Sequence, residues 1–204
     1  MRAPSFAGVI LAAGESSRMG RDKALLPWHG KTFLQAHIEL LNPFSELVIV
    51  VAGKNLPALE PVVYATGAFL VSNPNPELGQ FSSLQVGLRE VLNRGRDAAM
   101  IALVDRPPCK TETVALLLER FRLVYPQGRW AVVPELQGKH GHPIVAGREM
   151  IEAFLKAPTT STARDVEHAV QDKIEYVAVQ DPAVVMNVDT PEDYERLQLQ
   201  TSPR

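Results

Sequence analysis

The sequence predicts an α/β protein in which a mostly parallel sheet is covered by helices. Short apolar runs alternate along the chain with longer segments of helical period, which is the pattern of this fold class. The three strongest runs are almost continuously apolar, as expected for strands buried on both faces; they span residues 6–13, 46–52 and 98–104. Weaker strand candidates span residues 69–72, 130–134, 174–179 and 184–188.

Helical segments separate these runs. Apolar residues recur in them at spacings of three and four, which places them on one face of a helix. These faces are formed by Leu34, Ile38 and Leu41, by Leu84, Leu88, Val91 and Leu92, and by Val114, Leu117, Leu118 and Phe121. Pro191 and the two acids after it begin a last helix, since proline and negative charge both suit a first turn. No internal repeat or linker is visible, so residues 1–204 are expected to form one domain.

The composition excludes several classes of partner. The chain has 21 basic and 23 acidic residues and a formal net charge of −2, which gives no electrostatic reason to expect a nucleic acid or an anionic membrane. Cys109 is the single cysteine, so an internal disulfide is excluded and a reducing compartment is expected. The apolar run at residues 6–13 is too short to span a bilayer. We therefore expect a soluble, cytoplasmic protein.

The loop after the first run combines small residues with fixed positive charge. In open α/β sheets, ligands bind beyond the carboxyl ends of the strands, which is where residues 11–23, LAAGESSRMGRDK, lie. Glycines let the backbone approach a ligand, exposed N–H groups bind anions, and Arg18 and Lys23 add charge. The spacing matches neither GxxxxGK[ST] nor GxGxxG. These features suit a triphosphate, and an ordinary solvated loop is the alternative.

The longer string LAAGESSRMGRDKALL, residues 11–26, closely resembles the signature loop LAAGxSxRMGxxKxLL of the MobA-like nucleotidyltransferases. The resemblance implies a Rossmann-like three-layer α/β/α sandwich in which this loop wraps the triphosphate of a nucleotide. It assigns phosphate contacts, and with them catalytic roles, to Arg18 and Lys23. It also implies nucleotide-binding roles for Leu11, Ala12, Ala13 and Gly14.

Two aspartates are candidate ligands for Mg²⁺. Asp105 follows the third apolar run, where a carboxylate can hold the metal against phosphate oxygens; an aspartate that opens a turn before proline is the alternative. Asp105-Arg106-Pro107 resembles the family's aspartate-x-proline, although Arg106 is a departure that either contacts phosphate or points into solvent. Asp189 lies in MNVDTPED, which resembles the family's closing D-x-D-T-P-E-D element, with Asn187 as another departure. The resemblance implies that Asp189 completes the metal site, whereas helix capping explains the same string.

Residues 73–84, NPNPELGQFSSL, lead from a strand candidate into a helix. Gly79 and the serines could present donors at the helix N-terminus, and a proline-rich turn with serine capping is the alternative. The segment resembles the family's stretch after the third strand, although Gln80 stands where methionine is frequent. The nucleotide-binding residues that this implies are Asn73, Gly79, Ser82 and Ser83.

Residues 138–143, GKHGHP, are the most histidine-rich stretch. A metal site here would lack a nearby cysteine or carboxylate to complete it, and a polar hairpin tip is the simpler alternative. The resemblance favours a third interpretation, in which Gly141, His142 and Pro143 match a glycine-x-proline element beside an acceptor pocket. It implies that His142 donates a hydrogen bond to an acceptor phosphate.

The resemblance covers nearly the whole chain, with motif matches in the family's order. LAAG and GHP are similar to the cytidylyltransferase branch, which joins CMP from CTP to the terminal phosphate of molybdopterin and releases pyrophosphate. Relatives that transfer GMP usually have glycine where Ala13 stands, which favours CTP over GTP. The predicted activity is therefore a Mg²⁺-dependent nucleotidyltransferase that uses CTP and molybdopterin.

Two alternatives stay open. One is a transferase that acts on a sugar phosphate or another phosphorylated small molecule. The other is a non-catalytic nucleotide-binding chaperone of a molybdenum enzyme, which the altered residues Gln80, Arg106 and Asn187 keep open.

Overall fold

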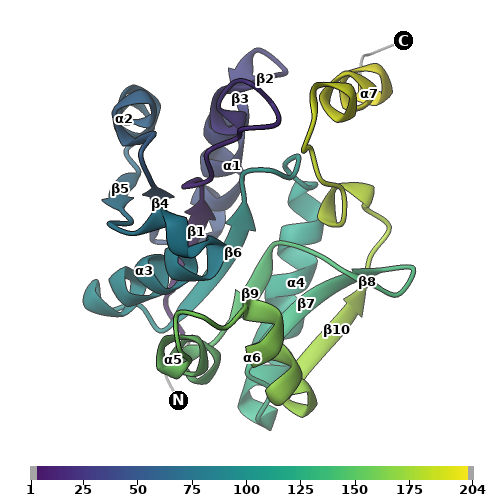
Figure 1. The fold of residues 1–204 in the computed structure, drawn as a ribbon. Helices are drawn as coiled ribbons and strands as arrows, with labels where there is room; N and C mark the ends of the chain where they lie inside the picture. Colours follow the sequence, from purple (N-terminus) through teal and green to yellow (C-terminus); the bar gives the residue numbers. More distant parts are fainter. Residues whose placement is uncertain (1–3, 202–204) are drawn as a thin grey trace.

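The computed structural model describes residues 4–201, which build a central sheet with helices on both faces (Figure 1). The sheet has eight strands in the order β10-β7-β9-β6-β1-β4-β5, with β8 paired to β7. The strands are β1 (Phe6–Leu11), β4 (Leu47–Ala52), β5 (Phe69–Ser72), β6 (Ala98–Leu103), β7 (Ala131–Leu136), β8 (Lys139–His140), β9 (Ile144–Ala146) and β10 (Ile174–Ala178). A separate hairpin pairs β2 (Pro27–Trp28) with β3 (Lys31–Thr32).

The sheet is mostly parallel. Strand β1 pairs in parallel with β4 and β6, β4 with β5, and β7 with β10. Strand β9 is antiparallel to both β6 and β7. Every residue of β1 and β6 is buried, as the continuous apolar runs predict for central strands covered on both faces. Because β4, β1 and β6 are parallel neighbours, the segments that follow them meet at one edge of the sheet.

Two layers of helices bury the two faces of the sheet. The helices are α1 (Phe33–Leu41), α2 (Leu56–Ala65), α3 (Gln80–Asn93), α4 (Thr111–Val124), α5 (Arg148–Lys156), α6 (Ala163–Ala169) and α7 (Pro191–Thr201). Side chains of α1, α2, α4 and α7 join one apolar core, and those of α3, α5 and α6 join the other. The predicted three-layer α/β/α sandwich with a mostly parallel sheet is confirmed. Within residues 4–201, no helix has the length and apolar character needed to cross a bilayer.

The predicted strand at residues 184–188 is wrong. The carboxylate of Asp181 accepts a hydrogen bond from the backbone N–H of Ala183 at 3.2 Å, and Pro182–Val184 form a 3-10 turn. An Asp-Pro pair favours such a turn, so local turn chemistry overrides the apolar pattern. Val184 and Val188 are nevertheless fully buried. They pack into the core without joining the sheet.

Candidate active site

Asn55 holds the loop after β1 against the loop after β4. Its side-chain amide donates to the carbonyl of Ala12 at 2.8 Å and to the carboxylate of Asp22 at 2.7 Å. Its Oδ1 accepts from the backbone N–H of Gly53 at 3.0 Å. These bonds reach both ends of the β1 loop and fix its shape. Asn55 was not among the residues predicted from the sequence, although a polar residue just beyond an apolar strand is a recognisable signal.

Gly53 allows these two loops to approach closely. A Cβ atom at this residue would lie 2.8 Å from the carbonyl oxygen of Ala13 and 3.1 Å from Cβ of Pro76. No larger side chain fits without moving backbone. The methyl group of Ala13 is therefore held in a fixed place beside the β4 loop.

Lys23, Arg18 and Asp189 form a charged cluster above the sheet. The Lys23 ammonium donates to Oδ1 of Asp189 at 2.6 Å, and the Arg18 guanidinium lies 3.3 Å from the same oxygen. The side chain of Lys23 is 11% exposed, whereas that of Arg18 is 70% exposed. The structure thus brings together two predicted phosphate ligands and one predicted metal ligand.

Asp105 lies just beyond the end of β6, next to this cluster. Its backbone carbonyl accepts from the N–H of Val188 at 2.8 Å, which places the segment containing Asp189 beside it. Burial raises the pKa of Asp105, and Asp189 adds to this, while the charges of Lys23 and Arg106 oppose it. Oδ1 of Asp105 is buried and has no hydrogen-bond partner among the described residues. Such an atom costs free energy unless a ligand binds it.

These two carboxylates suit a hard divalent cation that also binds a substrate. Among residues 4–201, no group of three or more histidine, cysteine or acidic side chains could hold a metal ion. The described residues therefore do not build a complete coordination shell by themselves. Mg²⁺ is commonly held by one or two carboxylates together with water and substrate phosphates. The unpartnered oxygen of Asp105 fits this arrangement.

Arg106, which departs from the family's pattern, does not point away into solvent. Its guanidinium donates to the carbonyl of Val184. Burial lowers the pKa of Arg106, and the neighbouring Asp105 carboxylate opposes this shift. The backbone carbonyl of Arg106 is 2.9 Å from Nε2 of His37, a buried residue of α1. Arg106 thus ties the end of β6 to the turn before Asp189.

The segment before α3 and the first turn of α3 contain residues that are buried and residues that line a cleft. The side-chain amide of Asn73 donates to Oγ of Ser82 at 2.8 Å and to Oγ of Ser83 at 2.9 Å. Ser82 in turn donates to the carbonyl of Gly79 at 2.8 Å. Asn73 and Ser82 are buried and hold the turn, and Gly79 adopts a φ of +91° that favours glycine. Gly79, Gln80 and Ser83 line a cleft, and Ser83 does so although it is buried.

This cleft lies between the β1 loop and the start of α3 and has a volume of about 430 Å³. Its lining residues are Leu11, Ala13, Gly14, Glu15, Pro76, Glu77, Gly79, Gln80 and Ser83. Through Ala13, Gly14 and Glu15 the cleft adjoins a second hollow of about 470 Å³. This hollow lies over residues 13–23 of the loop after β1, which we call the charged loop. Ligand sites commonly have volumes of this order. The loop and the start of α3 therefore bound one extended site.

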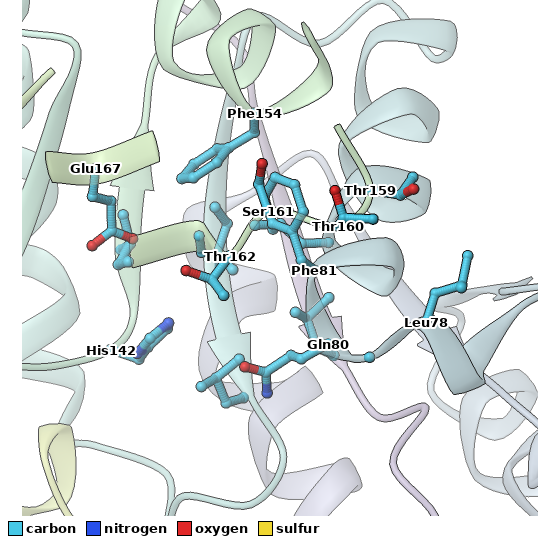
Figure 2. Close-up of a pocket in the computed structure, with 17 residues that line it drawn as sticks. Leu78, Gln80, Phe81, His142, Phe154, Thr159, Thr160, Ser161, Thr162 and Glu167 are labelled. Carbon is cyan, nitrogen blue, oxygen red and sulfur yellow. The ribbon is translucent and has the colours of Figure 1, made fainter. Parts of the chain in front are cut away.

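The histidine-rich stretch forms a hairpin, and its two histidines face different surroundings. His140 stacks on Tyr176 with ring centroids 4.0 Å apart and lies 3.4 Å from the carboxylate of Glu135. His142 instead lines a cavity of about 360 Å³ beside the cleft (Figure 2). Gly141 packs so tightly that a Cβ would lie 2.3 Å from the carbonyl oxygen of Val184. The pair therefore does not share a metal site.

The imidazole of His142 is neutral at ordinary pH. Burial lowers its pKa to about 3, and the nearby charge of Arg106 acts in the same direction. Nδ1 is buried without a partner among the described residues. Gly141 and Pro143 are buried, whereas His142 is half-buried, and of this predicted trio it presents the polar side chain to the cavity.

The model of the MobA-like NTP transferase domain matches residues 8–174, which is most of the chain. The chain belongs to this family. The resemblance carried by the loop after β1 is confirmed. The prediction of a nucleotidyltransferase is confirmed as well, for the family but not for the base or the acceptor.

Relatives of this MobA-like protein include enzymes of both base preferences. The molybdenum cofactor guanylyltransferase of Xanthomonas euvesicatoria pv. vesicatoria (strain 85-10) is 30% identical, covering 94% of each chain. The molybdenum cofactor cytidylyltransferase of Escherichia coli (strain K12) is 24% identical, covering 91% of this chain and 92% of its own. The predicted choice of CTP therefore stays a prediction.

A solved structure of this fold is the Rv0371c protein of Mycobacterium tuberculosis H37Rv. It superposes with a TM-score of 0.79 at 28% identity, covering 97% of this chain and 98% of its own. A second structure of that protein, a complex with manganese, has a TM-score of 0.71 at 24% identity, covering 97% of this chain and 100% of its own.

Proposed function

We propose that this nucleotidyltransferase transfers CMP from CTP to the terminal phosphate of molybdopterin and releases pyrophosphate. The observation that carries the proposal is the meeting of Lys23, Asp105 and Asp189 beside a glycine-containing loop. Fixed cations for a triphosphate and two carboxylates for a divalent metal are the parts that phosphoryl-type transfer needs. We also propose that residues 1–204 form one cytoplasmic domain and that a molybdenum enzyme receives the product.

In this proposal, Lys23 and Arg18 bind the triphosphate. Both now contact one carboxylate oxygen of Asp189, at 2.6 and 3.3 Å. An anionic oxygen already sits between the two cations, so a phosphate oxygen of similar size and charge can take its place. The backbone of Leu11, Ala13 and Gly14 then borders the nucleotide, because these residues line the adjoining cleft.

Asp105 and Asp189 would hold the divalent cation, for which we propose Mg²⁺. When bound there, the cation would neutralise charge on the attacked α-phosphate and on the leaving pyrophosphate. Manganese is the metal in the complex of the mycobacterial relative. Loss of the contact between Asp189 and its two cations would leave Asp189 free to face the metal.

The chain's other task is alignment of the acceptor. A phosphate monoester is already ionised at neutral pH and needs no strong general base, so positioning and charge stabilisation are sufficient. His142 would donate a hydrogen bond to it from the cavity beside the cleft. Cys109 is not a nucleophile in this scheme, because burial raises the pKa of its thiol to about 12.

The proposed base site is the cleft between Ala13 and α3. Gly79 and Ser83 line it directly, whereas the buried residues Ala12, Asn73 and Ser82 would act by fixing the two walls. The methyl group of Ala13 narrows the cleft and favours a pyrimidine. Use of GTP is the second candidate, supported by the similarity to the molybdenum cofactor guanylyltransferase of Xanthomonas.

A substrate screen with pyrophosphate release as readout tests the proposal. CTP, GTP, ATP and UTP are each incubated with molybdenum-loaded molybdopterin and, in parallel, with a sugar 1-phosphate. We expect CTP with molybdopterin to release pyrophosphate only when a divalent cation is present. Preferential use of GTP would overturn the base assignment. Release with the sugar phosphate alone would overturn the acceptor, and nucleotide binding without release would favour a non-catalytic binder.

A further inference from the structure

A second compartment, which we name the Glu167 cavity, opens beside the proposed nucleotide cleft. It has a volume of about 360 Å³ and shares Leu11, Gly79 and Gln80 with the cleft, so the two are continuous. One of its walls is aromatic, because Phe81 and Phe154 meet edge to face with ring centroids 6.2 Å apart. None of the residues that line this cavity lies between residues 13 and 23, so Arg18 and Lys23 are not part of its walls.

The carboxylate of Glu167 enters this cavity from α6 (Figure 2). Among residues 4–201 it forms no hydrogen bond or ion pair, although Arg164 on the same helix is near enough to act on it electrostatically. Burial raises the pKa of this carboxyl to about 7. Burial also raises the pKa of Tyr176 on β10, and the nearby Glu167 adds to that shift. An unpaired acid in an apolar cavity costs stability and is typical of a ligand-binding group.

Hydroxyl groups border the same cavity. Thr159, Thr160 and Ser161 lie between α5 and α6, and their side chains form no hydrogen bond to a described residue. Thr162 differs, because its hydroxyl caps α6 by accepting from the N–H of Asp165 at 3.2 Å. The first three hydroxyls are therefore available to a ligand, next to apolar surface.

The size and walls of the cavity favour a flat heterocycle. Its volume is at the low end of the range of about 300–1,000 Å³ that is usual for ligand pockets. It therefore suits two fused rings, with the rest of a substrate extending into the cleft. His142 lines the cavity as well, so one molecule can reach both Glu167 and His142.

We propose that the Glu167 cavity is the subsite for the heterocycle of the acceptor, and that the Glu167 carboxylate accepts two hydrogen bonds from a 2-amino-4-oxopyrimidine edge. This inference rests on the proposed function, because the pterin of molybdopterin has that edge. The ring N–H and the neighbouring amino group are adjacent donors, which a carboxylate binds with both oxygens. The aromatic wall covers the ring face, and the phosphate end points towards His142 and the charged loop.

The guanine base of GTP carries the same 2-amino-4-oxopyrimidine edge as a pterin, so the experiment must distinguish these two ligands. Binding of 6-hydroxymethylpterin, CTP and GTP is measured by fluorescence and calorimetry for the wild-type protein, Glu167→Gln and Glu152→Gln. The control Glu152 lies on the neighbouring α5, has a side chain 45% exposed and does not line the cavity. Glu167→Gln keeps the shape and removes the charge, and thermal unfolding verifies that it is folded.

We expect Glu167→Gln to weaken pterin binding by about tenfold or more, because hydrogen bonds to a charged acceptor are lost. CTP affinity should stay unchanged, and Glu152→Gln should match the wild type for all three ligands. Equal pterin affinity in Glu167→Gln and wild type, or no pterin binding at all, would overturn the subsite. Weaker GTP binding with unchanged pterin binding would assign the cavity to guanine and also overturn it.

This binding assay does not depend on turnover, so it tests the subsite independently of the proposed transfer activity. Glutamate-dependent pterin binding without pyrophosphate release in the substrate screen would leave the subsite standing and remove the transferase assignment. Pyrophosphate release from molybdopterin with pterin binding insensitive to Glu167 would do the reverse.

Discussion

The ammonium group of Lys23 lies 2.6 Å from Oδ1 of Asp189, although 166 positions separate the two residues in the sequence. The contact forms because Lys23 ends the loop after β1, while the segment before α7 is hydrogen-bonded to the end of β6. Two elements that are neighbours in the sheet thus deliver opposite charges to one point. A triphosphate entering this point would compete with Asp189 for the lysine.

Lys23→Ala should weaken triphosphate binding or slow transfer by about 10–100-fold, because a charge-assisted contact to phosphate is lost. Nucleotide affinity from calorimetry and kcat from pyrophosphate release separate the two effects. Lys31→Ala is the matched control, since Lys31 forms its ion pair with Glu39 and lines none of the hollows around the loop. If affinity and rate are both unchanged in Lys23→Ala, Lys23 is an ordinary structural charge.

Asp105→Asn should lower turnover by about 100-fold or more, since an amide is a poor ligand for a divalent cation. The substitution is isosteric, so the melting temperature should stay close to that of the wild type. Asp172→Asn, at a side chain 73% exposed, is the control. Chelation with EDTA should abolish activity, and added Mg²⁺ or Mn²⁺ should restore it in the wild type. Near-normal turnover of Asp105→Asn at saturating metal would contradict the assignment.

Much of the fold was predictable because the central strands are buried on both faces and are therefore apolar throughout. The runs that became β1, β4 and β6 illustrate this, as does the apolar face of α4. Strand β9 and helix α6 escaped prediction because they are short, with three and seven residues. Over such lengths, neither the two-residue alternation of a strand nor the 3.6-residue period of a helix repeats often enough to be recognised.

The candidate site was predictable where residues form a contiguous motif, as at Arg18 and Lys23. Residues that the fold brings to the site from distant parts of the sequence were not predicted. Asn55 contacts two points of the β1 loop that lie 33 and 43 positions away. Glu167 looks like an ordinary surface acid in sequence, and only the packing around α6 places its carboxylate in a cavity. No local pattern contains that information.

Ala13→Gly should shift base preference from CTP towards GTP, since it removes a methyl group from the narrow side of the cleft. The effect should be modest, about tenfold in the ratio of kcat/KM values, because hydrophobic contacts of this size discriminate weakly. Competition between the two triphosphates with one acceptor measures it. Ala68→Gly, at a small buried residue that does not line the cleft, is the control. An unchanged ratio would show that other residues set the base choice.

His142→Ala should raise the KM for the acceptor by about tenfold while the KM for CTP stays nearly constant. Because burial lowers the pKa of His142 to about 3, its imidazole is neutral and the factor should be similar at about pH 6.5 and pH 8. His140→Ala is the control, since His140 stacks on Tyr176 outside the cavity. A strong loss of CTP binding in His142→Ala would assign the residue to the nucleotide instead.

Glu167 should lower the stability of the fold at neutral and basic pH. Burial raises the pKa of its carboxyl from 4.5 to about 7 in the folded protein, so the folded state holds this proton more tightly than the unfolded chain. The contribution of the protonated Glu167 to the free energy of unfolding is therefore fully present below pH 4.5 and is lost as the pH rises towards 7. Glu167→Gln has no charge to bury and should melt a few degrees higher than the wild type at about pH 8, with little difference at about pH 4. Thermal unfolding at both pH values, with Glu152→Gln as control, measures this; equal melting temperatures at about pH 8 would remove the stability cost that points to a ligand.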